Sequence, residues 1–297
     1  MPYLDPDILT AIGRAGFGPR RPVEGPIAGQ HRSPLHGLSP EFADFRSYAP
    51  GDDPKNLDWR AFARSDRLYI RRYEEESNLR AYVIVDASRS MAYVSPDSKR
   101  RSKFDTAATI GVSLAAVALR QRDAVGLMTA DRRAETVLTV SGANSQLAEF
   151  DNRLQSITPD GTTELVAALR PQVDQIARRS VVILISDFLT ELDELSTLLG
   201  QLRFRGCELL AVQVLDDDEL ELPFQSSTLF VDIEGDEELF AEPWAFREAY
   251  RDAMADYCSQ LEGEIRSAGY DFWQIRTGDP LPSALASRLH ARAAMSV

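Results

Sequence analysis

The chain has 297 residues, of which 44% are hydrophobic, and it carries a formal net charge of −13 at pH 7. This size suits one large domain with an extra segment, or two small domains, around a sizeable core. The acidic balance argues against general nucleic-acid binding. No apolar run is long enough to cross a membrane, and the first twelve residues lack the pattern of a secretory signal peptide. Cys207 and Cys258 lie far apart in the sequence and are expected to be thiols in a reducing cytoplasm.

The first 77 residues differ from the rest of the chain in composition. Residues 1–36 are rich in Gly, Pro and Arg without helical or strand periodicity, which predicts an extended N-terminal arm that is ordered only where it packs. Residues 37–77 instead mix aromatic side chains with arginines around the turn signal Pro50-Gly51-Asp52-Asp53. We expect this aromatic segment to pack on the main domain, which then spans residues 78–297.

From residue 79 onward, apolar runs of strand length alternate with segments of helix length. The predicted strands are 79–86, 124–130, 136–140, 180–187, 207–215, 229–233 and 271–276, and the predicted helices are 103–122, 146–157, 164–178, 192–205, 243–268 and 282–294. The strand at 136–140 is expected to be an antiparallel edge. The alternation predicts an α/β fold, a doubly wound, mostly parallel sheet with helices on both faces.

Three oxygen-bearing residues follow the first buried strand in the pattern Asp86-x-Ser88-x-Ser90. In open α/β sheets, ligand sites lie beyond the carboxyl ends of the strands. One carboxylate and two hydroxyls can converge there as hard ligands, and they leave room for water or a partner's carboxylate, as Mg²⁺ prefers. Taken alone, the motif also fits a strand-end turn with helix-capping serines.

Two further elements strengthen the prediction of a metal site. The loop 160–164 reads Asp-Gly-Thr-Thr-Glu and ends at a predicted helix start, and Asp187 ends a second buried strand. Three loops at the carboxyl edge of one sheet can then supply Asp86, Ser88, Ser90, Thr163 and Asp187 to a single ion.

This arrangement resembles the metal-ion-dependent adhesion site of von Willebrand factor A (vWA) domains. The resemblance matches Asp86, Ser88 and Ser90 to the ligands of the first loop, Thr163 to the threonine of the second loop and Asp187 to the aspartate of the third. Thr162 is an alternative to Thr163, which is preferred because a Glu-Leu helix start follows it directly. The resemblance implies that the site binds Mg²⁺, or in its place Mn²⁺ or Ca²⁺.

The segment before the first strand resembles the DUF58 family. The similarity is carried by four motifs: Gly37-Leu38-Ser39-Pro40-Glu41-Phe42, Tyr48-x-Pro50-Gly51-Asp52-Asp53, Asp58-Trp59 with Ala63-Arg64, and Tyr73-Glu74-Glu75-Glu76. These are bacterial proteins with a vWA-like domain, often encoded beside MoxR-type AAA+ ATPases. The resemblance therefore implies an adaptor for such an ATPase in protein assembly or remodelling, in a form without transmembrane helices.

The leading hypothesis is a non-enzymatic, metal-dependent protein-interaction module. The sequence has no phosphate-loop motif and no Gly-x-Ser-x-Gly elbow, so neither ATP hydrolysis nor serine-esterase chemistry is expected. One alternative is a metal-dependent phosphoester hydrolase, although no general base or second metal-ligand set accompanies the site. Another is a structural scaffold with a vestigial site.

Charge outside the motif suggests two further features. Between Arg205 and Arg247 the chain has no Lys or Arg, which predicts a solvated acidic surface or a docking face for a basic partner. The run Lys99-Arg100-Arg101, with Lys103, is interpreted as a solvated helix end, with phosphate binding as the alternative.

Overall fold

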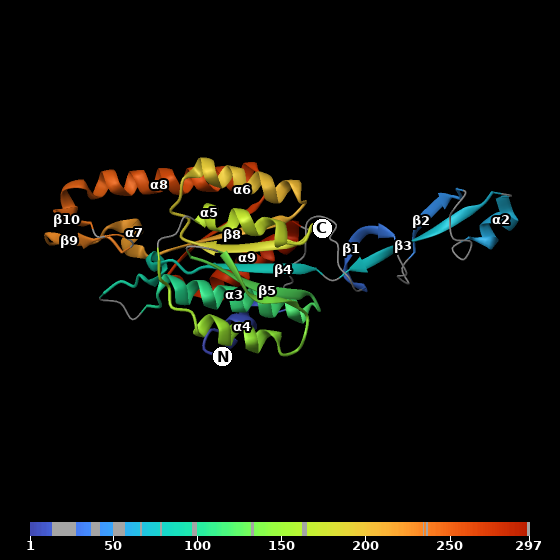
Figure 1. Cartoon of the computed structure of the whole chain (residues 1–297), viewed down its shortest axis with the longest axis horizontal. Coiled ribbons are helices and arrows are strands. Elements are labelled where there is room, and N and C mark those ends of the chain that lie inside the picture. Colours follow the sequence, from blue (N-terminus) through green and yellow to red (C-terminus); the bar gives the residue numbers. More distant parts are fainter. Residues whose placement is uncertain are drawn as a thin grey trace.

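The computed structural model describes residues 1–13, 28–36, 42–49, 57–65, 67–77, 79–96, 100–131, 134–161, 165–233, 235 and 237–295. Its centre is a six-stranded sheet in the order β11-β8-β7-β4-β5-β6 (Figure 1). All neighbouring pairs are parallel except β5 and β6, which are antiparallel. The strands are β4 (Arg80–Asp86), β5 (Ala124–Ala130), β6 (Ala134–Ser141), β7 (Val181–Ser186), β8 (Glu208–Leu215) and β11 (Asp271–Arg276). The predicted doubly wound sheet and its antiparallel edge are confirmed.

Helices cover both faces of this sheet, and each face has its own apolar core (Figure 1). One face carries α1 (Pro6–Ile12), α3 (Lys103–Arg120), α4 (Gln146–Gln155) and α9 (Leu281–Met295). The other carries α5 (Leu165–Leu169), the 3-10 helix η3 (Arg170–Gln175), α6 (Leu192–Phe204) and α8 (Pro243–Ser267). The middle strands β4 and β7 are apolar on both faces because helices bury both, as is typical of parallel sheets.

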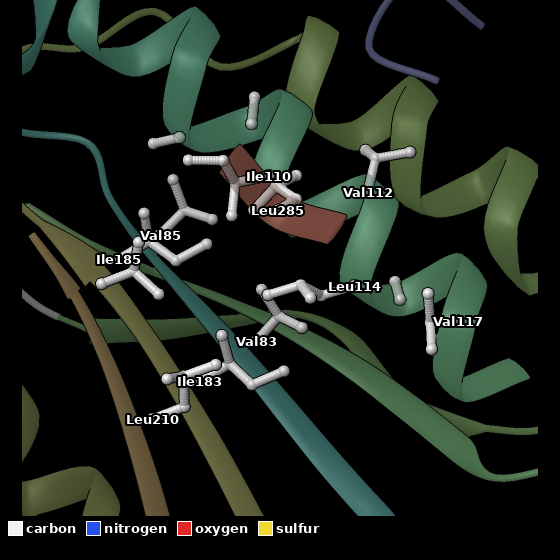
Figure 2. Close-up of a cluster of buried hydrophobic side chains, with 14 of the residues drawn as sticks. Val83, Val85, Ile110, Val112, Leu114, Val117, Ile183, Ile185, Leu210 and Leu285 are labelled. Atoms are coloured by element: carbon white, nitrogen blue, oxygen red, sulfur yellow. The ribbon is translucent and has the colours of Figure 1, made fainter. Parts of the chain in front are cut away.

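Helix α3 lies closest to the middle of the sheet. Figure 2 shows Ile110 and Leu114 of this helix beside Val83, Val85 and Ile185 of the sheet. The close approach depends on Gly111, where an added Cβ would lie 3.3 Å from Cγ1 of Val83. The small residues of this segment therefore hold the start of α3, and with it Lys103, close to the carboxyl ends of β4 and β7.

A separate three-stranded antiparallel sheet precedes the main domain in the chain. It consists of β1 (Ala28–His36), β3 (Tyr69–Ser77) and β2 (Phe42–Ser47), in that order, accompanied by α2 (Trp59–Ser65). Figure 1 shows this sheet beyond one end of the six-stranded sheet, with β3 leading into β4. We expected residues 37–77 to pack on the core of the main domain, but their described elements do not. Among their aromatic side chains, Trp59 contacts Phe62 edge to face, so part of the aromatic character serves contacts within the segment.

The extended arm predicted for residues 1–36 is wrong for two parts of it. Residues 6–12 form α1, whose N-terminus is capped by Asp5 and whose Ile8 and Ile12 are fully buried in the core. Residues 28–36 form β1. One apolar pair at i and i+4 is enough to anchor a helix of about two turns, which is too short for its period to show in the sequence. The division of the chain at residues 37 and 78 stays a prediction.

Three other elements differ from expectation. The helix predicted at 164–178 is described as α5 and then η3, because Pro171 cannot continue an α-helical hydrogen-bond ladder. The short helix α7 (Asp217–Glu221) and strand β10 (Glu238–Ala241) were not predicted from the sequence. Strand β10 pairs with β9 (Thr228–Val231) in an isolated hairpin. Within the described residues, no helix is long and apolar enough to cross a membrane.

Candidate metal centre

The candidate site lies where the order of the sheet reverses. From β4 the chain goes to β5 on one side, and β7 lies on the other side, parallel to β4 with Val85 opposite Ile185. Such a switch point opens a crevice at the carboxyl ends of the two strands. Asp86 ends β4 and Asp187 directly follows β7, so the two predicted carboxylates are brought to the same edge.

The first loop turns tightly around the carboxylate of Asp86. The backbone N–H of Ser88 donates to Asp86 Oδ1 at 2.9 Å, and Ser88 begins the short 3-10 helix η2 (Arg89–Ala92). This turn brings the hydroxyl oxygens of Ser88 and Ser90 within 3.0 Å of each other. The strand-end turn of the alternative interpretation is therefore present, but Ser88 forms no side-chain capping hydrogen bond with η2. The backbone satisfies one oxygen of Asp86, and both hydroxyls stay at the crevice.

The third loop completes the cluster through Asp187. Ser90 donates its hydroxyl to Asp187 Oδ2 at 3.0 Å, while Leu189 donates its backbone N–H to Oδ1 at 3.2 Å. The Gln213 amide holds the Asp187 carbonyl oxygen at 3.0 Å. The structure thus brings together four of the five predicted ligands: Asp86, Ser88, Ser90 and Asp187.

The second loop reaches the first through backbone hydrogen bonds. Asp160 donates its N–H to the carbonyl of Ala87, and Arg89 donates its N–H to the carbonyl of Gly161, both at 3.0 Å. Asp160 also forms a salt bridge with the Arg89 side chain at 2.6 Å. Thr162 and Thr163, the two candidates for the threonine position, lie outside the described residues.

Two residues that the sequence analysis did not assign to the site lie in it. Ser186, the last residue of β7, donates its hydroxyl to Asp86 Oδ2 at 2.6 Å and ties the two strand ends together. The sequence signal that could have assigned Ser186 to the site is its position directly before Asp187 at the end of the strand.

The second unassigned residue is Lys103, and here the expectation of a solvated helix end is wrong. Its side chain is 0% exposed and its ammonium donates to Asp187 Oδ2 at 2.8 Å and to Glu219 Oε1 at 2.6 Å. It is the first residue of α3, and the close packing of that helix on the sheet carries it inward. Neighbouring Arg100 and Arg101 are exposed, as expected for a helix end.

Glu219 connects the site to helix α7. Its second oxygen, Oε2, accepts from the backbone N–H of Asp216 at 2.7 Å, and the Asp216 side chain accepts from Asp218, forming a capping box. One ammonium therefore links the candidate metal site to the start of α7. Burial alone lowers the pKa of Lys103, but the charges of Asp187 and Glu219 reverse this and raise the pKa above its ordinary value.

The electrostatics of the site favour a cation. Burial, followed by the nearby charge of Asp187, raises the pKa of Asp86 to about 7, although hydrogen bonds from Ser186 and Ser88 lower it in part. Burial also raises the pKa of Glu219. Asp187 and Glu219 share the single ammonium of Lys103, and Asp86 adds a third carboxyl group to the site. A bound divalent ion would neutralise the excess of negative charge.

The donor set fits a hard ion better than a soft one. Among the described residues, no three His, Cys, Asp or Glu side chains cluster closely enough to hold a metal by themselves. The site instead offers two carboxylates and two hydroxyls, and all of these donors are oxygens. Such a set suits Mg²⁺, which keeps several waters and takes few protein ligands.

The chain is similar to several known proteins. A family model described as "Protein of unknown function DUF58" matches residues 44–259. The uncharacterized proteins Rv1480 of Mycobacterium tuberculosis and Mb1516 of Mycobacterium bovis are each 25% identical to the chain over 282 residues, covering 92% of this chain and 86% of theirs.

Several solved structures are also similar to the chain. An aerotolerance-related membrane protein from Bacteroides fragilis has a TM-score of 0.49 at 16% identity, and BatB from Bacteroides thetaiotaomicron has 0.46 at 15%; each match covers 73% of this chain and 100% of the other. The VWA domain of SpRpn10 has a TM-score of 0.42 at 11% identity, covering 71% of this chain and 95% of that domain.

Proposed function

Because the chain belongs to the DUF58 family, whose function is unknown, we propose from its site that it is a non-enzymatic, metal-dependent protein-interaction module. One observation carries the proposal. Asp86, Ser88, Ser90 and Asp187 come from two separated loops and meet at the switch point of the sheet, joined by contacts of 2.9–3.0 Å.

Asp86, Ser88, Ser90 and Asp187 would hold the ion, with Thr163 as the proposed fifth ligand. The ion is proposed to be Mg²⁺, with Mn²⁺ or Ca²⁺ as substitutes. When bound, it supplies a directional, positively charged contact for an acidic side chain of another protein. The chain's own residues hold the hydroxyls in place and supply the charge. These roles favour protein binding over hydrolysis, because the described residues around the site include no histidine that would serve as a general base.

We further propose that the partner is a MoxR-type AAA+ ATPase in the cytoplasm, as the family resemblance implies. The eleven Asp and Glu side chains of residues 216–242, without a single Lys or Arg, support attraction to a basic face of such a partner.

Thermal melts of the purified protein test the metal site. We expect Mg²⁺ or Mn²⁺ to raise the melting temperature of the wild type relative to chelator, because an ion that binds only the folded state stabilises it. Asp86→Asn and Asp187→Asn should lose this rise. Asp160→Asn is the matched control, since Asp160 lies beside the site but is salt-bridged to Arg89 and belongs to no predicted ligand set. Equal shifts in the wild type and in Asp86→Asn would contradict the proposal.

Co-purification with the ATPase tests the partner. Complex formation should require Mg²⁺ and be lost in Asp86→Asn but retained in Asp160→Asn. If Asp86→Asn and Asp187→Asn bind the ATPase as the wild type does, the metal plays no part in that interaction. Turnover of a generic phosphate ester that disappears in Asp86→Asn would favour the hydrolase alternative instead.

A further inference from the structure

A groove of about 730 Å³ opens beside the candidate metal centre. Ser90 and Asp187 of that centre line it, together with strand β9. Leu222, Phe224 and Phe230 contribute much of its apolar wall. The groove and the candidate metal site are therefore continuous, so one partner can contact both.

The β9–β10 hairpin beside this groove exposes an unusual amount of apolar surface. Phe230 packs edge to face on Phe224, with ring centroids 5.5 Å apart, which fixes one face of the hairpin. Leu229 and Val231, the residues on either side of Phe230, also line the groove, and Leu229 pairs with Phe240 of β10. Leu229, Val231 and Phe240 are 51%, 57% and 70% exposed.

Exposure of this kind indicates a binding surface. An isolated two-stranded hairpin is only marginally stable in water. Exposed apolar patches on a soluble protein often mark sites that bind another molecule. Leu239 of β10 and Trp244 at the start of α8 are exposed as well. We call Leu229, Val231 and Phe240 the hairpin patch.

The charge around the groove defines the chemistry of its occupant. Asp218 and Asp232 line the groove with Asp187 and Glu219, two carboxylates that share the single ammonium of Lys103, so the lining keeps an excess of negative charge. The chain has no Lys or Arg between residues 206 and 246. Arg247, which ends this interval, donates to the carbonyl oxygens of Leu222 and Phe224 at 2.8 and 2.6 Å. Its guanidinium therefore stabilises the backbone of residues 222–224. An apolar surface inside an acidic rim is complementary to apolar side chains flanked by cations, and it repels anionic lipid headgroups.

We propose that the groove and the hairpin patch bind a segment of a partner protein in which apolar side chains are flanked by Lys or Arg. This inference rests on the proposed function, because it adds a second contact surface to the same interaction module. The metal contact would select an acidic residue of the partner, and the groove would select the neighbouring basic and apolar sequence.

Labelled synthetic peptides test the proposal by fluorescence anisotropy, using the full chain in chelator. Three peptides of equal length are compared: an apolar core flanked by Lys, the same core flanked by Glu, and a Ser core flanked by Lys. Only the first should bind. Val231→Ser and Phe240→Ser should weaken its binding about tenfold or more. Phe204→Ser is the matched control, because Phe204 is 82% exposed on α6 and does not line the groove.

Each other outcome overturns the proposal. Equal binding of the Glu-flanked peptide would remove the charge argument, and equal binding of the Ser-core peptide would reduce the interaction to net charge. Unchanged binding by Val231→Ser and Phe240→Ser would place the peptide elsewhere. If the chain self-associates in sedimentation and Phe240→Ser abolishes this, the occupant of the patch is a second copy of the chain. If phosphatidylglycerol vesicles bind through the same patch, the occupant is a membrane surface.

The peptide test is independent of the metal test. Binding in chelator does not require an ion, so a failed Mg²⁺ melt with retained peptide binding would reject the metal site and leave the groove. The reverse pair of results would reject the groove and leave the metal site.

Discussion

At the scale of single residues, Asp86 is the most informative side chain of the site. It is almost completely buried, and two hydrogen bonds from Ser88 and Ser186 do not balance the effects of burial and of the charge of Asp187. A carboxylate kept under these conditions lowers the stability of the metal-free protein. Its retention is explained if an ion neutralises it in the working state.

The first prediction concerns the pH dependence of stability in chelator. The pKa of Asp86 is about 7 in the folded protein against 3.8 ordinarily, so the folded state holds an extra proton between these values. The free energy of unfolding should therefore fall as pH rises from about 4 to 7, by on the order of 2–4 kcal/mol from this group. Urea unfolding across this range measures it.

Asp86→Asn provides the comparison, because the amide keeps the shape and removes the ionisation. In chelator at pH 8 the variant should be more stable than the wild type, and the difference should shrink toward pH 4. Mg²⁺ should reverse the order at pH 8. A variant that is equally destabilised at every pH would show that Asp86 acts only through its hydrogen bonds.

The second prediction concerns Lys103. Replacing it by Met leaves Asp187 and Glu219 without their buried counter-charge, which should lower the free energy of unfolding by about 3–5 kcal/mol in chelator. Because a divalent ion can supply the missing charge, Mg²⁺ should stabilise Lys103→Met more than it stabilises the wild type. Chemical denaturation with and without Mg²⁺ measures both effects.

Arg153→Met is the control for Lys103→Met. Arg153 forms an exposed i,i+4 pair with Glu149, and such pairs contribute only about 0.5 kcal/mol. If the two variants lose similar stability, the ammonium of Lys103 is not an essential part of the site.

At the scale of elements, the distance between α3 and the sheet decides where Lys103 lies. Gly111 allows this approach, since any side chain there meets Val83 and Ile185. The helix is otherwise rich in Ala and small polar residues, and its inner stripe is fully buried. The packing of this one helix therefore connects the core of the domain to the geometry of the candidate metal centre.

The third prediction tests that packing. Gly111→Leu should lower the free energy of unfolding by about 1–3 kcal/mol, because the core has no room for the added side chain. Gly263→Leu in α8 is the matched control: an added Cβ there meets nothing within 4 Å, and the helix should gain about 0.5–1 kcal/mol. Equal responses of the two variants in urea unfolding would contradict the close approach of α3.

At the scale of the whole molecule, the first and the last of the described helices, α1 and α9, lie on the same face of the sheet. Helix α1 packs against α9, and Ile8 and Ile12 share a core with Leu285 and Leu289. Leu281 lies at the start of α9, and Arg292 lies near its end. Arg292 is buried there and forms ion pairs with Glu208 and Asp271. The N-terminal residues thus belong to the main domain even though a separate three-stranded sheet interrupts them in sequence.

The fourth prediction follows from this arrangement. Ile12→Ala should lower the free energy of unfolding of the main domain by about 2–5 kcal/mol, because it leaves a cavity in the common core. Leu239→Ala is the control, since Leu239 is 62% exposed and its truncation should have little effect. If Ile12→Ala leaves the denaturation midpoint unchanged, α1 does not stabilise the domain.

The sheet, most of its helices and the proximity of four predicted ligand residues could be predicted from the sequence alone. Buried parallel strands are continuous apolar runs, and their carboxyl ends share one edge of the sheet, so Asp86 and Asp187 could be placed together from local patterns alone. The alternation of strands and helices carried the same information about the doubly wound fold.

The burial of Lys103, the packing of α1 and the exposure of the hairpin patch become visible only in the folded structure. Lys103 reads as one more cation at a helix start, and its burial depends on how closely α3 packs on the sheet. Helix α1 is too short to show a hydrophobic period, and its two isoleucines are buried because they pack against α9. The exposure of Leu229, Val231 and Phe240 depends on which elements fail to cover them, which no local pattern records. Long-range packing, and not local propensity, is the common physical reason.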